Sequence, residues 1–156
     1  MYKNIMVPLD GSELAECVLP HVDALAKGCQ MENVTFVRVV EDVRMPGGAE
    51  AGLDDKQLKE MFASRKAEAE QYLNQLVKRT KFDKVNVKKV LLKGSVADTL
   101  ADYATKNDVD LILISTHGRS GISRWIWGSV ADRILRSACV PVFMIRAPGC
   151  VPGVTG

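Results

Sequence analysis

The stretch LILISTHGRSG at residues 111–121 is an apolar run that leads directly into a turn of small residues. Its first four residues are all leucine or isoleucine, which is typical of a strand buried on both faces of a parallel sheet. Gly118 and Gly121 lack side chains, so the backbone can approach a bound group closely. Further on, Gly128 and Ser129 are expected to open a helix, whose free amides favour an anion such as phosphate. The spacing alone leaves a second interpretation open, in which the glycines serve only the path of the loop.

Short β-rich runs and longer helical stretches alternate along the rest of the chain. Leucine and valine recur at helical spacing over residues 13–27, and Gly28 is placed to end that helix. Alternation of this kind predicts βαβ units and therefore an α/β fold with an open, mostly parallel sheet and helices on both faces. The five expected strands cover residues 4–9, 33–40, 84–92, 111–115 and 140–145.

Residues 54–80 are rich in Lys, Glu, Gln and Ala and predict a long helix that covers the sheet. Its apolar stripe consists of Leu58, Met61, Phe62, Ala69, Leu73 and Leu76. Residues 44–53 hold one proline and three glycines and predict a mobile surface loop, with a lid as the alternative. We expect one domain over residues 1–147 and a flexible tail over residues 148–156, where glycine and proline recur without periodicity.

The composition fits a single globular domain with one core. The chain has 156 residues, 47% of them hydrophobic, and a formal charge of +2, which is too balanced to indicate a nucleic-acid partner. The sequence shows neither a signal peptide nor an apolar segment long enough for a membrane, so we expect a cytoplasmic protein without a membrane partner. Four cysteines lie far apart and are interpreted as buried or incidental thiols in a reducing compartment.

A five-residue sequence, GSVAD, occurs twice, at residues 94–98 and 128–132. In each copy the serine can cap the first amides of a helix, and the aspartate favours the positive end of the helix dipole. The pentapeptide alone therefore predicts only a helix start. A functional role for the second copy depends on the glycine turn that precedes it and that the first copy lacks.

The first strand ends in Pro8-Leu9-Asp10-Gly11-Ser12. Open parallel sheets bind ligands at the carboxyl ends of their strands, and Asp10 could hold a ribose hydroxyl or a metal attached to phosphates. Alternatively, Asp10 or Ser12 caps the following helix.

Residues 5–12, IMVPLDGS, and the stretch 110–145 resemble the universal stress protein (UspA) family, and the resemblance covers nearly the whole chain. ATP-binding members of that family carry Gly, two residues, Gly, nine residues and Gly-Ser/Thr. Gly118, Gly128 and Ser129 match this motif, whereas Ser115 replaces its first glycine. A serine there adds bulk beside the ligand, which would weaken nucleotide binding.

The resemblance implies a Rossmann-like nucleotide-binding α-hydrolase-like fold with strand order 3-2-1-4-5. It also implies that Asp10 contacts the ribose of the nucleotide, with Ser12 beside it, and it assigns residues to adenine and to the phosphates. Adenine would lie among Pro8, Val39, Val40 and Ile114, and the phosphates on Gly118, Gly128, Ser129 and Val130. Ser115, at the first position of the motif, is also counted among the nucleotide-binding residues. Arg119 and His117 belong to the same turn. Arg119 lies within reach of phosphate, with a solvated surface role as the alternative, and His117 is interpreted as ordering the loop.

Three functions remain open at this point. The leading hypothesis is a regulatory or sensor module in the stress response that binds ATP or another adenine nucleotide, with Mg or Mn as a possible companion. A slow ATP hydrolase is the second, although no residue is an obvious base for activating water, so no catalytic residue is assigned. The third is a nucleotide-free scaffold of the same fold. The resemblance also implies a homodimer through the apolar last strand, with Val142, Phe143, Met144 and Ile145 at its interface.

Overall fold

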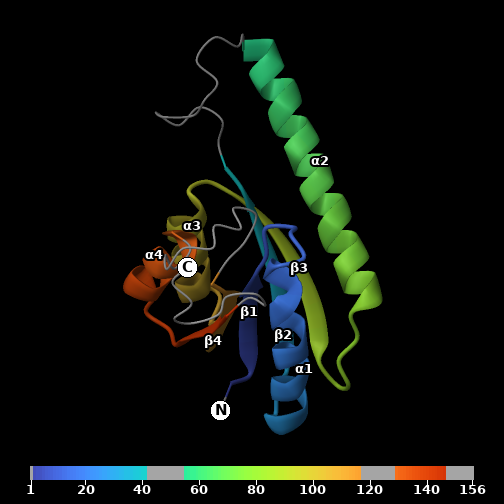
Figure 1. Cartoon of the computed structure of the whole chain (residues 1–156), viewed down its shortest axis with the longest axis vertical. Helices are drawn as coiled ribbons and strands as arrows, with labels where there is room; N and C mark the ends of the chain where they lie inside the picture. The colour runs from blue at the N-terminus through green and yellow to red at the C-terminus, as the bar shows by residue number, and fades with distance from the viewer. Residues whose placement is uncertain (1, 42–54, 117–128, 147–156) are drawn as a thin grey trace, which may run out of the picture.

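The computed structural model describes residues 2–41, 55–116 and 129–146, and its centre is a five-stranded sheet with helices on both faces (Figure 1). Every strand pairs in parallel with its neighbours, in the order β3-β2-β1-β4-β5. The strands are β1 (Asn4–Pro8), β2 (Asn33–Val40), β3 (Asn86–Lys93), β4 (Leu111–Ser115) and β5 (Val142–Ile145). The helices are a 3₁₀ helix η1 (Ala15–Val18), α1 (Leu19–Gly28), α2 (Asp55–Arg79), α3 (Val96–Lys106) and α4 (Ser129–Ser137). The predicted fold class and strand order are confirmed.

Two apolar layers bury the sheet, one on each face. Val22 of α1 and Leu73 of α2 cover one face together with alternate strand residues such as Phe36. Leu100 of α3 and Ile134 of α4 cover the other face. The interior strands β1 and β4 are buried along almost their whole length, as expected for parallel strands covered on both sides.

Three asparagines fix the register at the amino-terminal edge of the sheet. Asn4, Asn33 and Asn86 lie side by side on β1, β2 and β3. The Asn33 side-chain amide donates to Asn4 Oδ1 at 2.8 Å, and that of Asn86 donates to Asn33 Oδ1 at 3.1 Å. This ladder lies at the opposite end of the strands from the predicted site, so we assign it a structural role.

Three predicted boundaries need correction. The first helix does not begin at residue 13 as a continuous α-helix: η1 precedes α1, and Pro20 lies in the first turn of α1, where its missing N–H does no harm. The third strand begins at Asn86 rather than at residue 84, because Lys84 has a φ of 58° and belongs to a turn. The last strand begins two residues later than predicted, at Val142, and lies at the sheet edge as expected.

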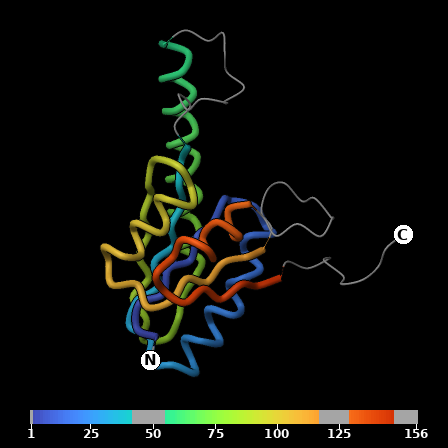
Figure 2. The backbone as a smooth tube through the Cα atoms, turned by 90° about the vertical axis from the view of Figure 1, so that its left-hand side faces the viewer, coloured from blue at the N-terminus to red at the C-terminus, as the bar shows by residue number. Residues whose placement is uncertain are grey.

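Helix α2 has its buried side chains only in its carboxyl-terminal half. Ala69, Leu73 and Leu76 are buried, whereas Leu58 and Phe62 of the predicted stripe are half-exposed. Figures 1 and 2 show why: the amino-terminal part of α2 extends beyond the sheet. The prediction that the whole stripe covers the sheet is therefore wrong.

Two predictions fall on residues outside the described part of the chain. These are the loop at residues 44–53 and the tail at residues 148–156.

Candidate functional site

The carboxyl ends of β1 and β4 lie next to each other at the point where the chain changes direction across the sheet. After β1 the chain continues into η1 and α1 on one face, whereas α4, which follows β4 in the chain, packs on the other face. Such a switch point is where open α/β sheets form their ligand crevice. The strand order thus brings the end of β1, with Asp10, beside the end of β4, with Ser115, as predicted.

Asp10 organises the turn that follows β1. Its Oδ1 accepts hydrogen bonds from the backbone N–H of Ser12 at 2.9 Å and from the Ser12 hydroxyl at 2.6 Å. The Ser12 hydroxyl oxygen in turn accepts the N–H of Ala15 at 3.2 Å, at the start of η1. Gly11 between them has a φ of +86°, which favours glycine. Ser12 thus accepts the first amide of η1, although it is not the N-cap residue of η1 or of α1. Since a carboxylate accepts several hydrogen bonds, a ribose contact by Asp10 is compatible with this turn.

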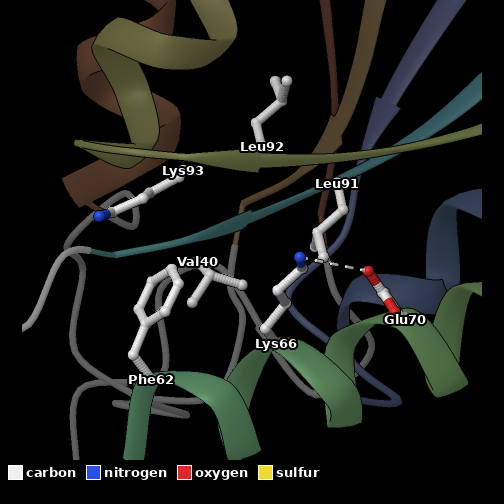
Figure 3. A pocket seen from close by; sticks show the side chains of 7 residues that line it. All are labelled: Val40, Phe62, Lys66, Glu70, Leu91, Leu92 and Lys93. Carbon is white, nitrogen blue, oxygen red and sulfur yellow. Dashed lines mark ion pairs between the residues drawn. The ribbon is translucent and has the colours of Figure 1, made fainter. Parts of the chain in front are cut away.

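The four residues predicted around adenine do not share one face of the sheet. Pro8 pairs in register with Val37, and Val37, Val39 and Ile114 all belong to the apolar layer under α3 and α4. Val40 is the next residue along β2, so its side chain points to the opposite face. There it lines a pocket of about 320 Å³ with Phe62 and Lys66 of α2 (Figure 3). The structure brings together Pro8, Val39 and Ile114 and separates Val40 from them.

The predicted phosphate side is described in part. Ser115 is buried at the end of β4, and the backbone N–H of Thr116 donates to the Ile145 carbonyl at 2.8 Å. Helix α4 begins at Ser129 as expected; Ser129 is exposed, and Val130 packs in the same apolar layer as Ile114 and Val39. The remaining predicted residues, His117, Gly118, Arg119 and Gly128, lie outside the described residues.

The first GSVAD copy differs from its predicted capping role. Gly94 and Ser95 follow the edge strand β3, away from the crevice, and α3 begins at Val96. Ser95 makes no side-chain hydrogen bond to the first amides of α3; its hydroxyl donates instead to Asp98 Oδ2 at 2.8 Å. Asp98 also accepts from Arg133 of α4 at 3.1 Å, so this copy links two helices. The predicted cap is therefore absent, and the Ser95 hydroxyl serves the contact with Asp98 instead.

Two findings on metal ligands and cysteines concern the described part of the chain. It contains no group of three or more His, Cys, Asp or Glu side chains that could hold a metal ion. Cys17 and Cys29 are half-buried free thiols and Cys139 is an exposed free thiol, within the interpretation of the cysteines as buried or incidental. None of the described helices is both long and apolar enough to cross a membrane.

Sequence and structure comparisons place these features in a known family. Residues 1–146 match the model of the universal stress protein family. The chain belongs to this family. Universal stress protein MJ0531 of Methanocaldococcus jannaschii is 29% identical over 150 residues, which cover 95% of this chain and 84% of that protein.

Solved structures agree with this assignment. The universal stress protein UspA from Lactobacillus plantarum superimposes with a TM-score of 0.75 at 28% identity, over 93% of this chain and 98% of its own. A universal stress protein family protein from Arabidopsis thaliana with AMP bound has a TM-score of 0.63 at 16% identity, over 94% of this chain and 93% of its own. At that identity the second likeness shows the fold alone.

A network behind the crevice of this universal stress protein was missed by the sequence analysis. Arg38 interrupts the apolar run of β2, and its guanidinium carbon lies 5.4 Å from the centre of the Tyr72 ring on α2. The Tyr72 hydroxyl donates to Glu16 Oε1 at 2.9 Å, and Arg79 pairs with the same carboxylate. The only signal in the sequence was an arginine within VTFVRVV, where a buried strand otherwise carries apolar residues.

The environment of the Tyr72 hydroxyl leads us to expect a specific pH dependence of the protein's stability. Burial raises the pKa of this hydroxyl above the ordinary value, and the hydrogen bond to Glu16 raises it further. The folded protein therefore holds this proton more tightly than the unfolded chain, so the contribution of Tyr72 to stability is complete below about pH 10 and is lost as the pH rises beyond that value.

We expect Tyr72→Phe to lower the free energy of unfolding by about 1 kcal/mol at neutral pH, through the lost hydrogen bond. The same variant should lose less stability than the wild type when the pH is raised above about 10. Urea unfolding from neutral to alkaline pH measures both effects, with Tyr2→Phe as the control for removing a phenol elsewhere. Parallel alkaline curves for wild type and Tyr72→Phe would contradict this account of the hydroxyl.

Proposed function

We propose that this universal stress protein binds an adenine nucleotide at the switch point between β1 and β4 and acts as a regulatory or sensor module in the stress response. The observation that carries the proposal is the placement of three predicted elements at the carboxyl end of the sheet, beside the switch point between β1 and β4. Pro8, Val39 and Ile114 supply an apolar wall on one face of the sheet, and Asp10 follows the adjoining end of β1. The amino-terminal end of α4 packs on the same face through Val130.

Each element suits one part of the ligand. An apolar wall suits the adenine ring, a carboxylate accepts hydrogen bonds from ribose hydroxyls, and a helix start attracts phosphate through its free amides and dipole. The AMP bound to a relative of the same fold is consistent with this division. We propose ATP as the nucleotide, with Mg or Mn on its phosphates, and the cytoplasm as the location.

Hydrolysis has less support than binding. Among the described residues of the proposed site, the carboxylate considered as a base for activating water is Asp10. It already accepts two hydrogen bonds from Ser12. A hydrolase would need a residue that orients the attacking water as well as groups that stabilise the transferring phosphoryl group. We therefore propose nucleotide binding without appreciable turnover. A nucleotide-free scaffold is the alternative, because Ser115, in place of the family's glycine, is buried at the end of β4.

We also propose a homodimer formed through β5. This strand is an edge of the sheet, so one side of its backbone has no partner within the sheet, and such an edge can pair with a second copy. Phe143 on β5 is 43% exposed and lies against His21 of α1, with ring centres 6.4 Å apart. An exposed aromatic side chain on an unpaired edge is suited to burial in a subunit interface.

The two GSVAD copies provide a matched test of the phosphate site. Ser129→Ala should weaken ATP binding about tenfold, since a hydrogen bond to a charged phosphate is lost. Ser95→Ala removes the same hydroxyl from the copy at the sheet edge and should change ATP affinity less than about twofold. Isothermal titration of both variants measures the difference. Equal ATP affinities of the two variants would contradict the proposal that the second GSVAD copy contacts the phosphates.

A further inference from the structure

Arg38 is a buried charge in a position that the proposed nucleotide site does not explain. Only 9% of its side chain is exposed, and its Nη2 lies 3.6 Å from Oε1 of Glu68, a side chain that is itself 63% exposed. The guanidinium also lies over the ring of Tyr72. A buried cation is costly to place in a strand unless the surrounding groups use it, and both of these partners come from α2.

The guanidinium also lies close to the turn that carries Asp10. A Cβ built on Gly11 would lie 3.0 Å from Arg38 Nη1 and 3.2 Å from Arg38 Cζ, so the guanidinium occupies the side of Gly11 where a side chain would otherwise project. Gly11 is the residue between Asp10 and Ser12, whose hydrogen bonds define the turn. Arg38 therefore lies close both to the ring of Tyr72 and to this turn.

Arg38 cannot belong to the adenine wall, because it faces the other way. It is the residue between Val37 and Val39 on β2, and both of those side chains contribute to the apolar layer under α3 and α4. Arg38 consequently points to the face covered by α1 and α2, where its partners Glu68 and Tyr72 lie. Any influence on a nucleotide must pass through the turn.

We propose that Arg38 is a positioning residue, which supports the Asp10-Gly11-Ser12 turn from behind and thereby sets the Asp10 carboxylate for the ribose of the nucleotide. This inference rests on the proposed function. Its chemical basis is the charged guanidinium, which is attracted to the face of an aromatic ring and fits closely beside a residue that has no side chain. It adds a structural link from α2 through Tyr72 and Arg38 to the ligand-binding turn. Tyr72 strengthens that link, since its hydroxyl also holds Glu16 just beyond the turn.

The first test is ATP titration of Arg38→Met, which keeps much of the side-chain volume but removes the charge and the planar group. We expect about tenfold weaker binding. Lys88→Met on the exposed strand β3 removes one positive charge away from the turn and is the matched control, expected to bind like the wild type. Should Arg38→Met fail to fold, Arg38→Gln takes its place. If the Arg38 and Lys88 substitutions weakened ATP binding equally, the loss would be explained by the change in net charge, and the proposal would be overturned.

A double-mutant cycle separates positioning from direct contact. If Arg38 acts through Asp10, Arg38→Met should change ATP affinity less than about twofold in a protein that already carries Asp10→Ala. Additive losses would overturn the proposal. A second readout needs no ligand: the amide of Ser12, which donates to Asp10, should exchange its hydrogen about tenfold faster in Arg38→Met, while the amide of Ile112 in the core is unchanged. Unchanged exchange at Ser12 would likewise overturn it.

The outcome for the wild type distinguishes this inference from the function on which it rests. Wild type that binds ATP, with Arg38→Met binding equally well, would overturn the positioning role and leave nucleotide binding intact. Wild type that binds no nucleotide would overturn the proposed function, and the role of Arg38 with it.

Discussion

Asp10→Ala is expected to weaken ATP binding by about 10- to 100-fold, the range for losing hydrogen bonds between a carboxylate and a ligand. The carboxylate follows β1 at the switch point, next to the apolar wall formed by Pro8 and Ile114. Its removal takes away the proposed ribose acceptor and also the acceptor for the Ser12 amide and hydroxyl. Calorimetric titration with ATP measures the loss.

A nucleotide without ribose hydroxyls tells these two effects apart. For 2′,3′-dideoxy-ATP, the wild type should already bind weakly, and Asp10→Ala should add little to that weakness. Asp10→Asn retains an oxygen that can accept from Ser12 and so controls for the shape of the turn. An equal loss for ATP and the dideoxy nucleotide would contradict a ribose contact by Asp10.

Phe143→Asp is expected to convert the proposed dimer into a monomer, with a dissociation constant raised by about 100-fold or more, because a buried, unpaired carboxylate at an interface is strongly unfavourable. Phe143 is one of two large apolar side chains exposed within the described residues, and it lies on the edge strand β5. Analytical ultracentrifugation over a concentration series measures the constant.

The second exposed apolar residue provides the control for this substitution. Leu135 on α4 is 46% exposed, but it does not belong to β5. We expect Leu135→Asp to leave the dimer constant within about tenfold of the wild-type value. A wild type that is monomeric at every concentration, or a Phe143→Asp variant that stays dimeric, would contradict pairing through β5.

The fold was predictable because its determinants are local or periodic. Runs such as LILI at residues 111–114 can be buried on both faces only in a covered parallel sheet, and the helical periods between the strands supply that cover. The strand order came from the family resemblance and is confirmed. Boundaries were less certain, because they depend on single residues such as Pro20 in the first turn of α1 and Lys84 with its positive φ.

The site was predictable only in outline, because its finer features depend on which way side chains point. Val39 and Val40 were grouped around adenine, although adjacent residues of a strand face opposite sides, and this alternation could have separated them. The reach of α2 beyond the sheet had no local signal, since Leu58 and Phe62 continue the apolar stripe past the region that is buried. Arg38 in β2 was visible in the sequence, but its partners Tyr72 and Gly11 are distant along the chain.

The most direct test of the central claim is calorimetric titration of nucleotide-stripped protein with ATP, ADP and AMP, each with and without magnesium. Gly128→Val, which would crowd the predicted phosphate contact, accompanies the wild type. Gly28→Val is the matched control, because a Cβ at Gly28 meets no atom within 4 Å. The account predicts saturable ATP binding by the wild type and by Gly28→Val, and its loss in Gly128→Val. An absence of binding by the wild type at millimolar nucleotide would contradict the account and favour the nucleotide-free scaffold.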